Sequence, residues 1–387
     1  MEFHSALAES ESLTEACDAV ASELRRALGP APLDLAVVFA SAGYGDDLGA
    51  LPVLLQERVA IKTLVGCTGE AQLHPDSMSA RAPAISVLAG RLSGAEAAAC
   101  SIQAPDLPHA DAPPSAWRAL LPQTQLPVRG VIVLGEPFHF DVRPLVDGLD
   151  FVLPDAPKVG GIASGSRHPH GNALFCGRAR LTQGAVLLAI AGDVTATPVV
   201  SQGCRPIGRP GKITSARGNR LAGVDELPAK AFVEQQLQQL TAAELPAETD
   251  QNPLFLGIAS DPFATAPPEA GDFLVRNVLG IDEDANLVVA EKLGIGRTVQ
   301  LHVRDQDSGL EDLERRLRRA GAHHADAAMV FRCVGRTSAD HERFHRVAGD
   351  VPMAGSTCNG EIGPVGRQTH VHGYSASCML LRKGAPS

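Results

Sequence analysis

The sequence carries three short loops in which glycines bracket small polar residues. They run from Gly66 to Glu70, from Gly160 to Gly165 and from Gly355 to Glu361. After a strand, consecutive backbone N–H groups without side-chain cover form a concave donor site for a carboxylate or phosphate. Thr68 and Thr357 add hydroxyls to such a site. The alternative is packing, because glycine also lets two backbone layers approach each other.

The third loop offers the most chemistry, through Gly355, Thr357, Cys358, Gly360 and Glu361. None of the three loops continues into the Gly-Lys-Ser/Thr of a Walker A loop, and none opens a helix as a dinucleotide-binding G-x-G-x-x-G does. A nucleotide site is therefore not predicted, and we expect no cofactor.

Arginines within or just after apolar, strand-like segments are a second source of chemistry: Arg276, Arg304 and Arg336. A buried guanidinium needs a partner, and a ligand carboxylate held by two parallel hydrogen bonds would supply it. Glu70 and Glu361 could form internal ion pairs with these arginines, or could bind the ammonium group of an amino acid.

Cys333 lies at a strand end, three residues before Arg336. A nearby guanidinium lowers the pKa of a thiol, so Cys333 is a candidate reactive cysteine. Cys358 lies inside the third loop, where we expect it to be the more exposed of the two. Both could instead be small core residues. A cysteine nucleophile also needs an oriented histidine, and the spacing identifies neither His370 nor His372 as that partner.

Residues 341–345 read His-Glu-Arg-Phe-His, which is the H-E-x-x-H pattern of zinc peptidases. The preceding residues are polar, however, and Ala348 stands where an extended zinc motif would continue. The histidine pairs at 168–170 and 370–372 are interpreted as surface and strand residues. We therefore predict no metal site.

Composition excludes several classes of protein. The formal net charge of the 387 residues is -10 and the pI is about 5.7, which argues against nonspecific nucleic-acid binding. A local basic stretch over 205–220 could be an anion-binding loop or a solvated face. No apolar run approaches the roughly 20 residues that span a bilayer, and no signal peptide is recognised. The eight cysteines form no C-x-x-C pair, so we expect a reduced, cytoplasmic protein without membrane insertion.

The elements that position these residues repeat along the chain. An apolar strand precedes each glycine loop: Phe39 to Gly66 and Leu134 to Gly161 are both 27 residues, and Phe331 to Gly355 is 24. Each repeat reads as strand, helix, strand and hairpin. A single such unit exposes an apolar face, so the units must stack. We predict a mixed α/β fold of layered mixed sheets in two related domains.

A capping box at Ser12 to Glu15 predicts a helix that ends before Gly29-Pro30, and a similar cap at Ser308 to Glu311 predicts another helix. Strand-like segments within 173–202 predict a β-meander. A Pro- and acid-rich segment, 244–253, predicts a linker. The predicted organisation is an N-terminal helix in 1–30, a first domain in 31–227, a helix and linker in 228–252 and a second domain in 253–383.

The second domain resembles the FIST C-terminal domain. The pieces that match are 273–277 with 280–282, 299–305, 331–336, 355–364 and 372–374. The first domain resembles the FIST N-terminal domain through Phe39, the 66–70 loop, Gly160-Gly161 and the segment from Gly203 to Gly208 with Asp225.

The resemblance implies a sensory module that binds a small ligand, with amino acids as the suggested ligands. We therefore expect binding rather than catalysis, signal transduction as the role, and output through an unknown downstream signalling protein. Two alternatives stay open: a Cys-dependent acyl transferase or hydrolase, and an interaction module without a ligand. The predicted ligand site comprises Arg276, Arg304, Cys333, Arg336, Gly355, Thr357, Cys358, Gly360 and Glu361, with Thr68 and Glu70 closing it.

Overall fold

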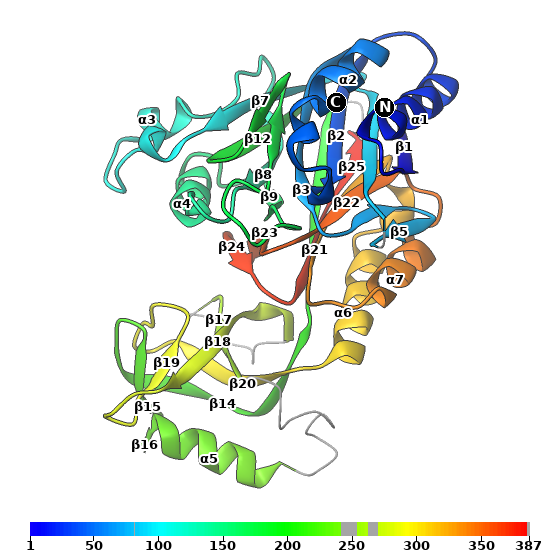
Figure 1. Cartoon of the computed structure of the whole chain (residues 1–387). Helices are drawn as coiled ribbons and strands as arrows, with labels where there is room; N and C mark the ends of the chain where they lie inside the picture. The colour runs from blue at the N-terminus through cyan, green and yellow to red at the C-terminus, as the bar shows by residue number, and fades with distance from the viewer. Residues whose placement is uncertain (81, 241–253, 262–269, 385–387) are drawn as a thin grey trace. The chain divides into compact units, whose positions relative to one another are not determined.

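The computed structural model describes residues 1–80, 82–240, 254–261 and 270–384 (Figure 1). The fold is mixed α/β, as predicted. The chain divides into two compact units. Unit 1 combines Met1–Val200 with Leu313–Ser387, and unit 2 is Ser201–Asp312. The linker predicted at 244–253 lies outside the described residues, and the domain boundaries stay a prediction.

Unit 1 contains three six-stranded sheets, each built around one parallel pair of strands. The first sheet has the order β1 (Glu2–Glu9), β6 (Ala84–Arg91), β2 (Leu33–Ser41), β3 (Ile61–Gly69), β10 (Leu174–Cys176), β11 (Ala179–Leu181). The second has the order β7 (Ala95–Ile102), β12 (Ala185–Gly192), β8 (Val128–Gly135), β9 (Lys158–Ile162), β23 (Glu361–Val365), β24 (Gln368–His372). The third has the order β13 (Val194–Gln202), β25 (Ser375–Lys383), β21 (Ala327–Cys333), β22 (Met353–Cys358), β4 (Gln72–His74), β5 (Ser77–Ser79).

The three parallel pairs, β2–β3, β8–β9 and β21–β22, are the repeats expected from the sequence. A helix lies in the connection within each pair: α2 (Leu51–Arg58), α4 (Val142–Val152) and α7 (Ala339–Ala348). In each pair a glycine lies opposite a valine: Gly66 opposite Val38, Gly160 opposite Val133 and Gly355 opposite Val330. A Cβ on these glycines would lie only 1.9, 1.8 and 2.2 Å from the valine carbonyl oxygens. Close backbone approach therefore requires glycine at the equivalent place in every repeat.

The hairpin that follows each glycine loop completes the sheet of another repeat. Hairpin β4–β5 follows β3 in the chain but pairs with β22 of the third sheet. Hairpin β10–β11 follows β9 but pairs with β3 of the first sheet. Hairpin β23–β24 follows β22 but pairs with β9 of the second sheet. The three sheets thus exchange hairpins in a closed cycle.

The inner faces of the three sheets share one hydrophobic cluster, which includes Leu134, Val159, Ala354, Phe39 and Phe331. The rings of Phe39 and Phe331 meet edge to face at 5.7 Å. Helices cover the outer faces. The first sheet is covered by α1 (Leu13–Leu28), the second by α4, and the third by α7 and the C-terminal part of α6 (Gln306–Arg319). The predicted cap of α1 is present, because the Ser12 side chain accepts a hydrogen bond from the Glu15 N–H.

Unit 2 is built on a seven-stranded sheet. Its order is β14 (Cys204–Arg217), β20 (Thr298–Arg304), β17 (Phe255–Ala259), β18 (Phe273–Ile281), β19 (Leu287–Val289), β15 (Arg220–Val224), β16 (Leu227–Pro228). Helix α5 (Ala229–Gln239) packs on this sheet through Phe232, beside Ile213 and Leu301. None of the described helices, in either unit, combines the length and apolarity needed to cross a membrane.

Two local predictions were wrong, and one strand was not predicted. Residues 173–202 do not form a meander, because β12 pairs with β7 and β8 while β10 and β11 join the first sheet. Residues 2–9 form an edge strand before the first helix, paired with β6. Helix α6 begins before the predicted cap at Ser308, because Asp305 accepts the Ser308 N–H at 3.0 Å.

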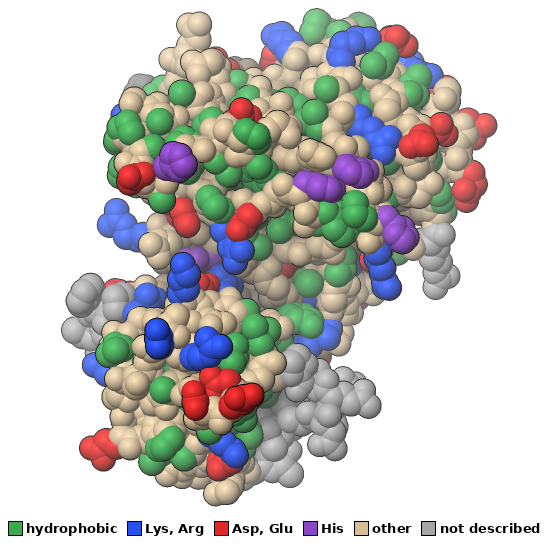
Figure 2. All heavy atoms as spheres, turned by 60° about the vertical axis from the view of Figure 1, so that its left-hand side comes forward, with side chains coloured by type: hydrophobic (Ala, Val, Ile, Leu, Met, Phe, Trp, Pro, Cys, Tyr) green, Lys and Arg blue, Asp and Glu red, His purple; other side chains and the backbone are tan. Residues whose placement is uncertain are grey.

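The basic stretch of unit 2 is balanced by acidic side chains. Arg205 pairs with Asp305 at 2.8 Å, and both Arg209–Asp225 and Arg220–Asp282 close at 3.0 Å. On the face that Figure 2 shows, Lys and Arg side chains are interspersed with Asp and Glu. These contacts favour a solvated, ion-paired face over an anion-binding loop.

Candidate functional site

The three glycine loops bind one another through their hydroxyl groups. The Ser164 Oγ accepts the Glu70 N–H at 3.1 Å and donates to the Thr357 carbonyl at 2.6 Å. The Thr357 Oγ1 accepts the Ala71 N–H at 2.9 Å. The Thr68 Oγ1 accepts the Ala173 N–H at 3.0 Å. The hydroxyls proposed for a ligand therefore hold backbone groups of the protein, which favours the packing alternative for Thr68 and Thr357.

Cys358 and the glycines of the third loop are buried in the same junction. The expectation that Cys358 is exposed was wrong, because β22 continues through residue 358 and turns this side chain into the core. A Cβ on Gly161 would lie 2.4 Å from the Cys358 Sγ. Burial raises the pKa of Cys358 well above its ordinary value. Gly355 lies within β22, and the Gly360 carbonyl accepts the Ile162 N–H at 2.9 Å.

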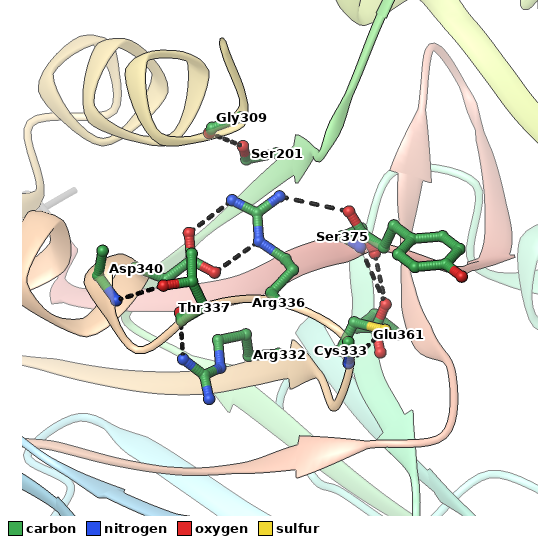
Figure 3. Close-up of polar contacts among 12 residues, drawn as sticks. Ser201, Gly309, Arg332, Cys333, Arg336, Thr337, Asp340, Glu361 and Ser375 are labelled. Carbon is green, nitrogen blue, oxygen red and sulfur yellow. Dashed lines mark hydrogen bonds and ion pairs between the residues drawn. The ribbon is translucent and has the colours of Figure 1, made fainter. Parts of the chain in front are cut away.

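Glu361 is the most unusual residue of the loop. It is fully buried at the start of β23, and its Oε2 accepts the Ser375 hydroxyl at 2.7 Å and the Ser375 N–H at 3.3 Å (Figure 3). Its Oε1 is buried without a hydrogen-bond partner among the described residues. Burial raises the pKa of Glu361 from 4.5 to about 8, although Ser375 and Arg336 oppose the rise. This shift favours the uncharged form of the carboxyl group at neutral pH.

Cys333 ends β21 beside Glu361, as Figure 3 shows. The expected lowering of its pKa was wrong. Burial and the neighbouring Glu361 raise the pKa of Cys333, and they outweigh the opposing effect of Arg336. A thiol of raised pKa carries little thiolate at neutral pH and is a poor nucleophile.

Arg336 already has a carboxylate partner within the protein. Its Nε and Nη2 donate to Asp340, both at 2.6 Å, and its Nη1 donates to the Tyr374 carbonyl at 3.3 Å. Arg336 lies in the turn that precedes α7 and Asp340 in the first turn of that helix, with side chains 6% and 3% exposed. This pair is a structural ion pair of the kind considered as the alternative to a ligand contact.

We call Glu361, Cys333 and Arg336, together with their hydrogen-bond partners, the Glu361 cluster. Tyr374 lies beside this cluster in a conformation that bulky residues rarely adopt. Its φ angle is 56°, a value that costs free energy outside glycine. A Cβ on Gly335 would lie 3.2 Å from the Tyr374 ring and 3.7 Å from the Cys333 Sγ. The ring thus packs against Gly335 next to the thiol. Strained residues of this kind concentrate at functional sites.

Three predicted residues lie elsewhere. Arg276 and Arg304 belong to unit 2, whereas the Glu361 cluster belongs to unit 1. Arg276 pairs with Glu291 at 2.9 Å, and Arg304 is half-buried at the end of β20. Glu70 is exposed. Whether any of them contacts a ligand stays a prediction.

The H-E-x-x-H segment lies within α7, with His341 half-buried and His345 exposed. Burial and the charge of Arg332 lower the pKa of His341. Among the residues that the structure describes, no group of three or more His, Cys, Asp or Glu side chains is arranged to hold a metal ion.

Sequence reasoning missed four residues of the cluster: Arg332, Asp340, Tyr374 and Ser375. Arg332 follows Phe331 in β21 and is 4% exposed. A charged residue inside an apolar strand was a usable signal for Arg332, of the same kind that singled out Arg276 and Arg304. The four-residue spacing of Arg336 and Asp340, at the entry to a predicted short helix, was a second signal.

Comparison with known proteins identifies a family for nearly the whole chain. Family models of the FIST N domain and the FIST C domain match residues 34–226 and 230–364. The chain is 34% identical over 263 residues to "Uncharacterized protein Rv0628c" of Mycobacterium tuberculosis, covering 65% of this chain and 67% of that protein. It is 33% identical, over the same length and shares, to "Uncharacterized protein Mb0898c" of Mycobacterium bovis.

Among solved structures, a cyanuric acid hydrolase from A. caulinodans aligns over 99% of both chains, with a TM-score of 0.37 and 9% identity, a likeness too weak to assign fold or activity. The two family models together cover nearly the whole chain. The protein therefore belongs to the FIST family, whose domains are sensory domains of signal transduction.

Proposed function

We propose that the protein senses a small ligand that carries both an ammonium and a carboxylate group, as an amino acid does, and that the Glu361 cluster binds it. The unpartnered Oε1 of Glu361 carries this proposal. Leaving a buried acceptor without a partner costs about 1–3 kcal/mol, and an ammonium group would supply the missing hydrogen bond.

The charge state of Glu361 couples ligand binding to proton release. Burial raises the pKa of this carboxyl group to about 8, which favours its uncharged form at neutral pH. An ammonium group beside it favours the carboxylate form, so a bound amine drives a proton from Glu361 into solvent. The ligand carboxylate would replace the Tyr374 carbonyl, which now accepts a long 3.3 Å hydrogen bond from Arg336.

The strained Tyr374 would provide the two states that a sensor needs. A ligand shifts a conformational equilibrium only if it binds one state better than the other. Displacement of the Tyr374 ring would open the cluster and relieve the strained φ angle. A downstream signalling protein in the cytoplasm would then read the ligand-bound state. The raised pKa of Cys333 favours this binding role over Cys-dependent acyl transfer.

Thermal unfolding with a panel of amino acids and small carboxylates tests the proposal. A ligand present at 100 times its dissociation constant stabilises the folded state by about 2.7 kcal/mol. The wild type and the exposed-site control Glu11→Gln should respond to the same ligand, whereas Glu361→Gln should not. Calorimetry in two buffers of different ionisation enthalpy should show net proton release at pH 7. If no compound stabilises the wild type, or if Glu361→Gln responds equally, the site is misassigned.

A further inference from the structure

A pocket of ligand size lies in unit 1, where helix α4 meets the chain segment 108–117. Its volume is about 450 Å³, within the roughly 300–1,000 Å³ of small-molecule sites in proteins. Helix α3 (Pro114–Arg118) belongs to this segment and packs against α4 (Figure 1). The lining of the pocket includes Pro108, Asp111, Trp117, Pro144, Asp147 and Phe151.

The indole ring of Trp117 is held against α4. A Cβ on Gly148 would lie 2.0 Å from the Trp117 Cε3, so the ring packs directly on the backbone of that helix. Glycine within a helix lowers its stability relative to alanine, and here the missing side chain makes room for the ring. The aromatic wall of the pocket is therefore formed by the fold itself, as in most small-molecule sites.

The rest of the wall is largely apolar and open to solvent. Phe151 lies three residues after Gly148 in α4, and it is 59% exposed, whereas Trp117 is 5% exposed. Pro108 and Pro144 line the same pocket. A ligand with an apolar body would remove this surface from water, which favours binding.

The charged residues of the lining are acidic. Asp111 and Asp147 are both exposed, and no Lys, Arg or His is among the described residues that line the pocket. The Asp111 carboxylate forms no ion pair or hydrogen bond with another described residue. A carboxylate and aromatic rings are the groups that recognise an ammonium ion. A ligand carboxylate would instead be repelled by the two aspartates.

We propose that this pocket binds a small organic cation in which an ammonium group is joined to an aromatic or similarly apolar body. The apolar body would contact Trp117 and Phe151, and the ammonium group would pair with Asp111. The ligand differs from the amino acid proposed for the Glu361 cluster because it has no carboxylate. The pocket shares no residue with that cluster, so the two proposals stand or fall separately.

Fluorescence titration of the wild-type protein is the primary test. Trp117 is the single tryptophan of the chain and lines the pocket, so its emission reports binding directly. Titration with 2-phenylethylammonium should change this emission in a saturable way, with a dissociation constant below about 1 mM. Phenylacetate and 2-phenylethanol, which carry a negative or a neutral group on the same apolar body, should bind at least about tenfold more weakly.

Three results of this titration would overturn the proposal. They are no saturable change with 2-phenylethylammonium, equal binding of phenylacetate, and tighter binding of a short lysine- and proline-containing peptide than of the free amine. The last result would assign the pocket to a partner protein instead of a small molecule.

Two matched pairs of variants locate the site. Asp111→Asn should weaken binding of 2-phenylethylammonium about tenfold, whereas Asp155→Asn, which removes an exposed acid outside the lining, should not. Phe151→Ser should also weaken it about tenfold, whereas Phe138→Ser, at a position that is 42% exposed and outside the lining, should not. All four side chains are exposed, so the variants should fold. Equal effects within either pair would contradict the assignment.

Discussion

Replacing Glu361 by glutamine should change how the stability of unit 1 depends on pH. In the unfolded chain this carboxyl group loses its proton near pH 4.5, whereas in the folded protein burial raises the pKa to about 8. Between these values the folded state binds more protons than the unfolded state, so stability falls as pH rises. The stabilising contribution is complete below about pH 4.5 and is lost as the pH rises through about 8.

The size of this effect follows from the two pKa values. At about 1.4 kcal/mol for each tenfold change in proton affinity, a rise from 4.5 to about 8 corresponds to roughly 5 kcal/mol as an upper limit. The Glu361→Gln variant has no proton to lose, and its amide oxygen can still accept the Ser375 hydroxyl. Its stability relative to the wild type should therefore increase steadily from pH 5 to pH 8 and level off above.

Urea unfolding followed by tryptophan fluorescence measures this difference. The protein has a single tryptophan, Trp117 in the short helix α3 (Pro114–Arg118), which is buried within unit 1. The signal therefore reports the unit that contains Glu361. Glu11→Gln serves as the control for loss of an exposed acid. A stability difference between Glu361→Gln and the wild type that stays constant within about 1 kcal/mol from pH 5 to 8 would refute the reasoning.

Three further predictions use the same structure. Arg336→Met leaves the buried Asp340 without its partner and should lower the free energy of unfolding, measured in urea, by about 3–5 kcal/mol. Arg318→Met removes a side chain that is 59% exposed and should lower it by less than about 1 kcal/mol, so equal losses would contradict a buried ion pair. Gly160→Ala places a Cβ 1.8 Å from the Val133 carbonyl oxygen and should lower the free energy of unfolding by about 3 kcal/mol or prevent folding. Gly49→Ala, with open space around the added Cβ, should have little effect. A folded Gly160→Ala protein of unchanged stability would show that the two strands separate freely. Because the pKa values of Cys333 and Cys358 are raised, iodoacetamide at pH 7.5 should label both more slowly in the native protein than in the unfolded chain, as read by peptide mass spectrometry; faster labelling of native Cys333 would revive the nucleophile hypothesis.

Periodicity and glycine spacing were sufficient to predict the mixed α/β fold and its repeats. The fold and its repeats are encoded in local sequence, because each buried strand is a short apolar run and each place where two strand backbones come close requires a glycine. The hairpin exchange could not be predicted in this way. Segments such as 72–79 have the same local pattern whichever sheet they join, and only tertiary packing selects β22 as their partner.

The candidate site was predicted in part. Glu361, Cys333 and Arg336 lie together, and Figure 3 shows them in one cluster. The sequence could not reveal that Arg336 is satisfied by Asp340, or that burial reverses the expected shift in the pKa of Cys333. Both outcomes depend on which neighbours desolvate a group, and single-sequence patterns carry little information on burial at strand ends.

The closed exchange of hairpins has a consequence for how unit 1 acquires its structure. The first sheet needs β10–β11, the second needs β23–β24, and the third needs β4–β5, so no repeat can finish its sheet alone. The pairing of β4 with β22 joins residues that are about 280 positions apart, and all of unit 2 is synthesised between them. Contacts of such long range slow folding and leave sheet edges exposed in the meantime. On the ribosome, residues 1–200 must therefore wait with unpaired strands until the third repeat has emerged.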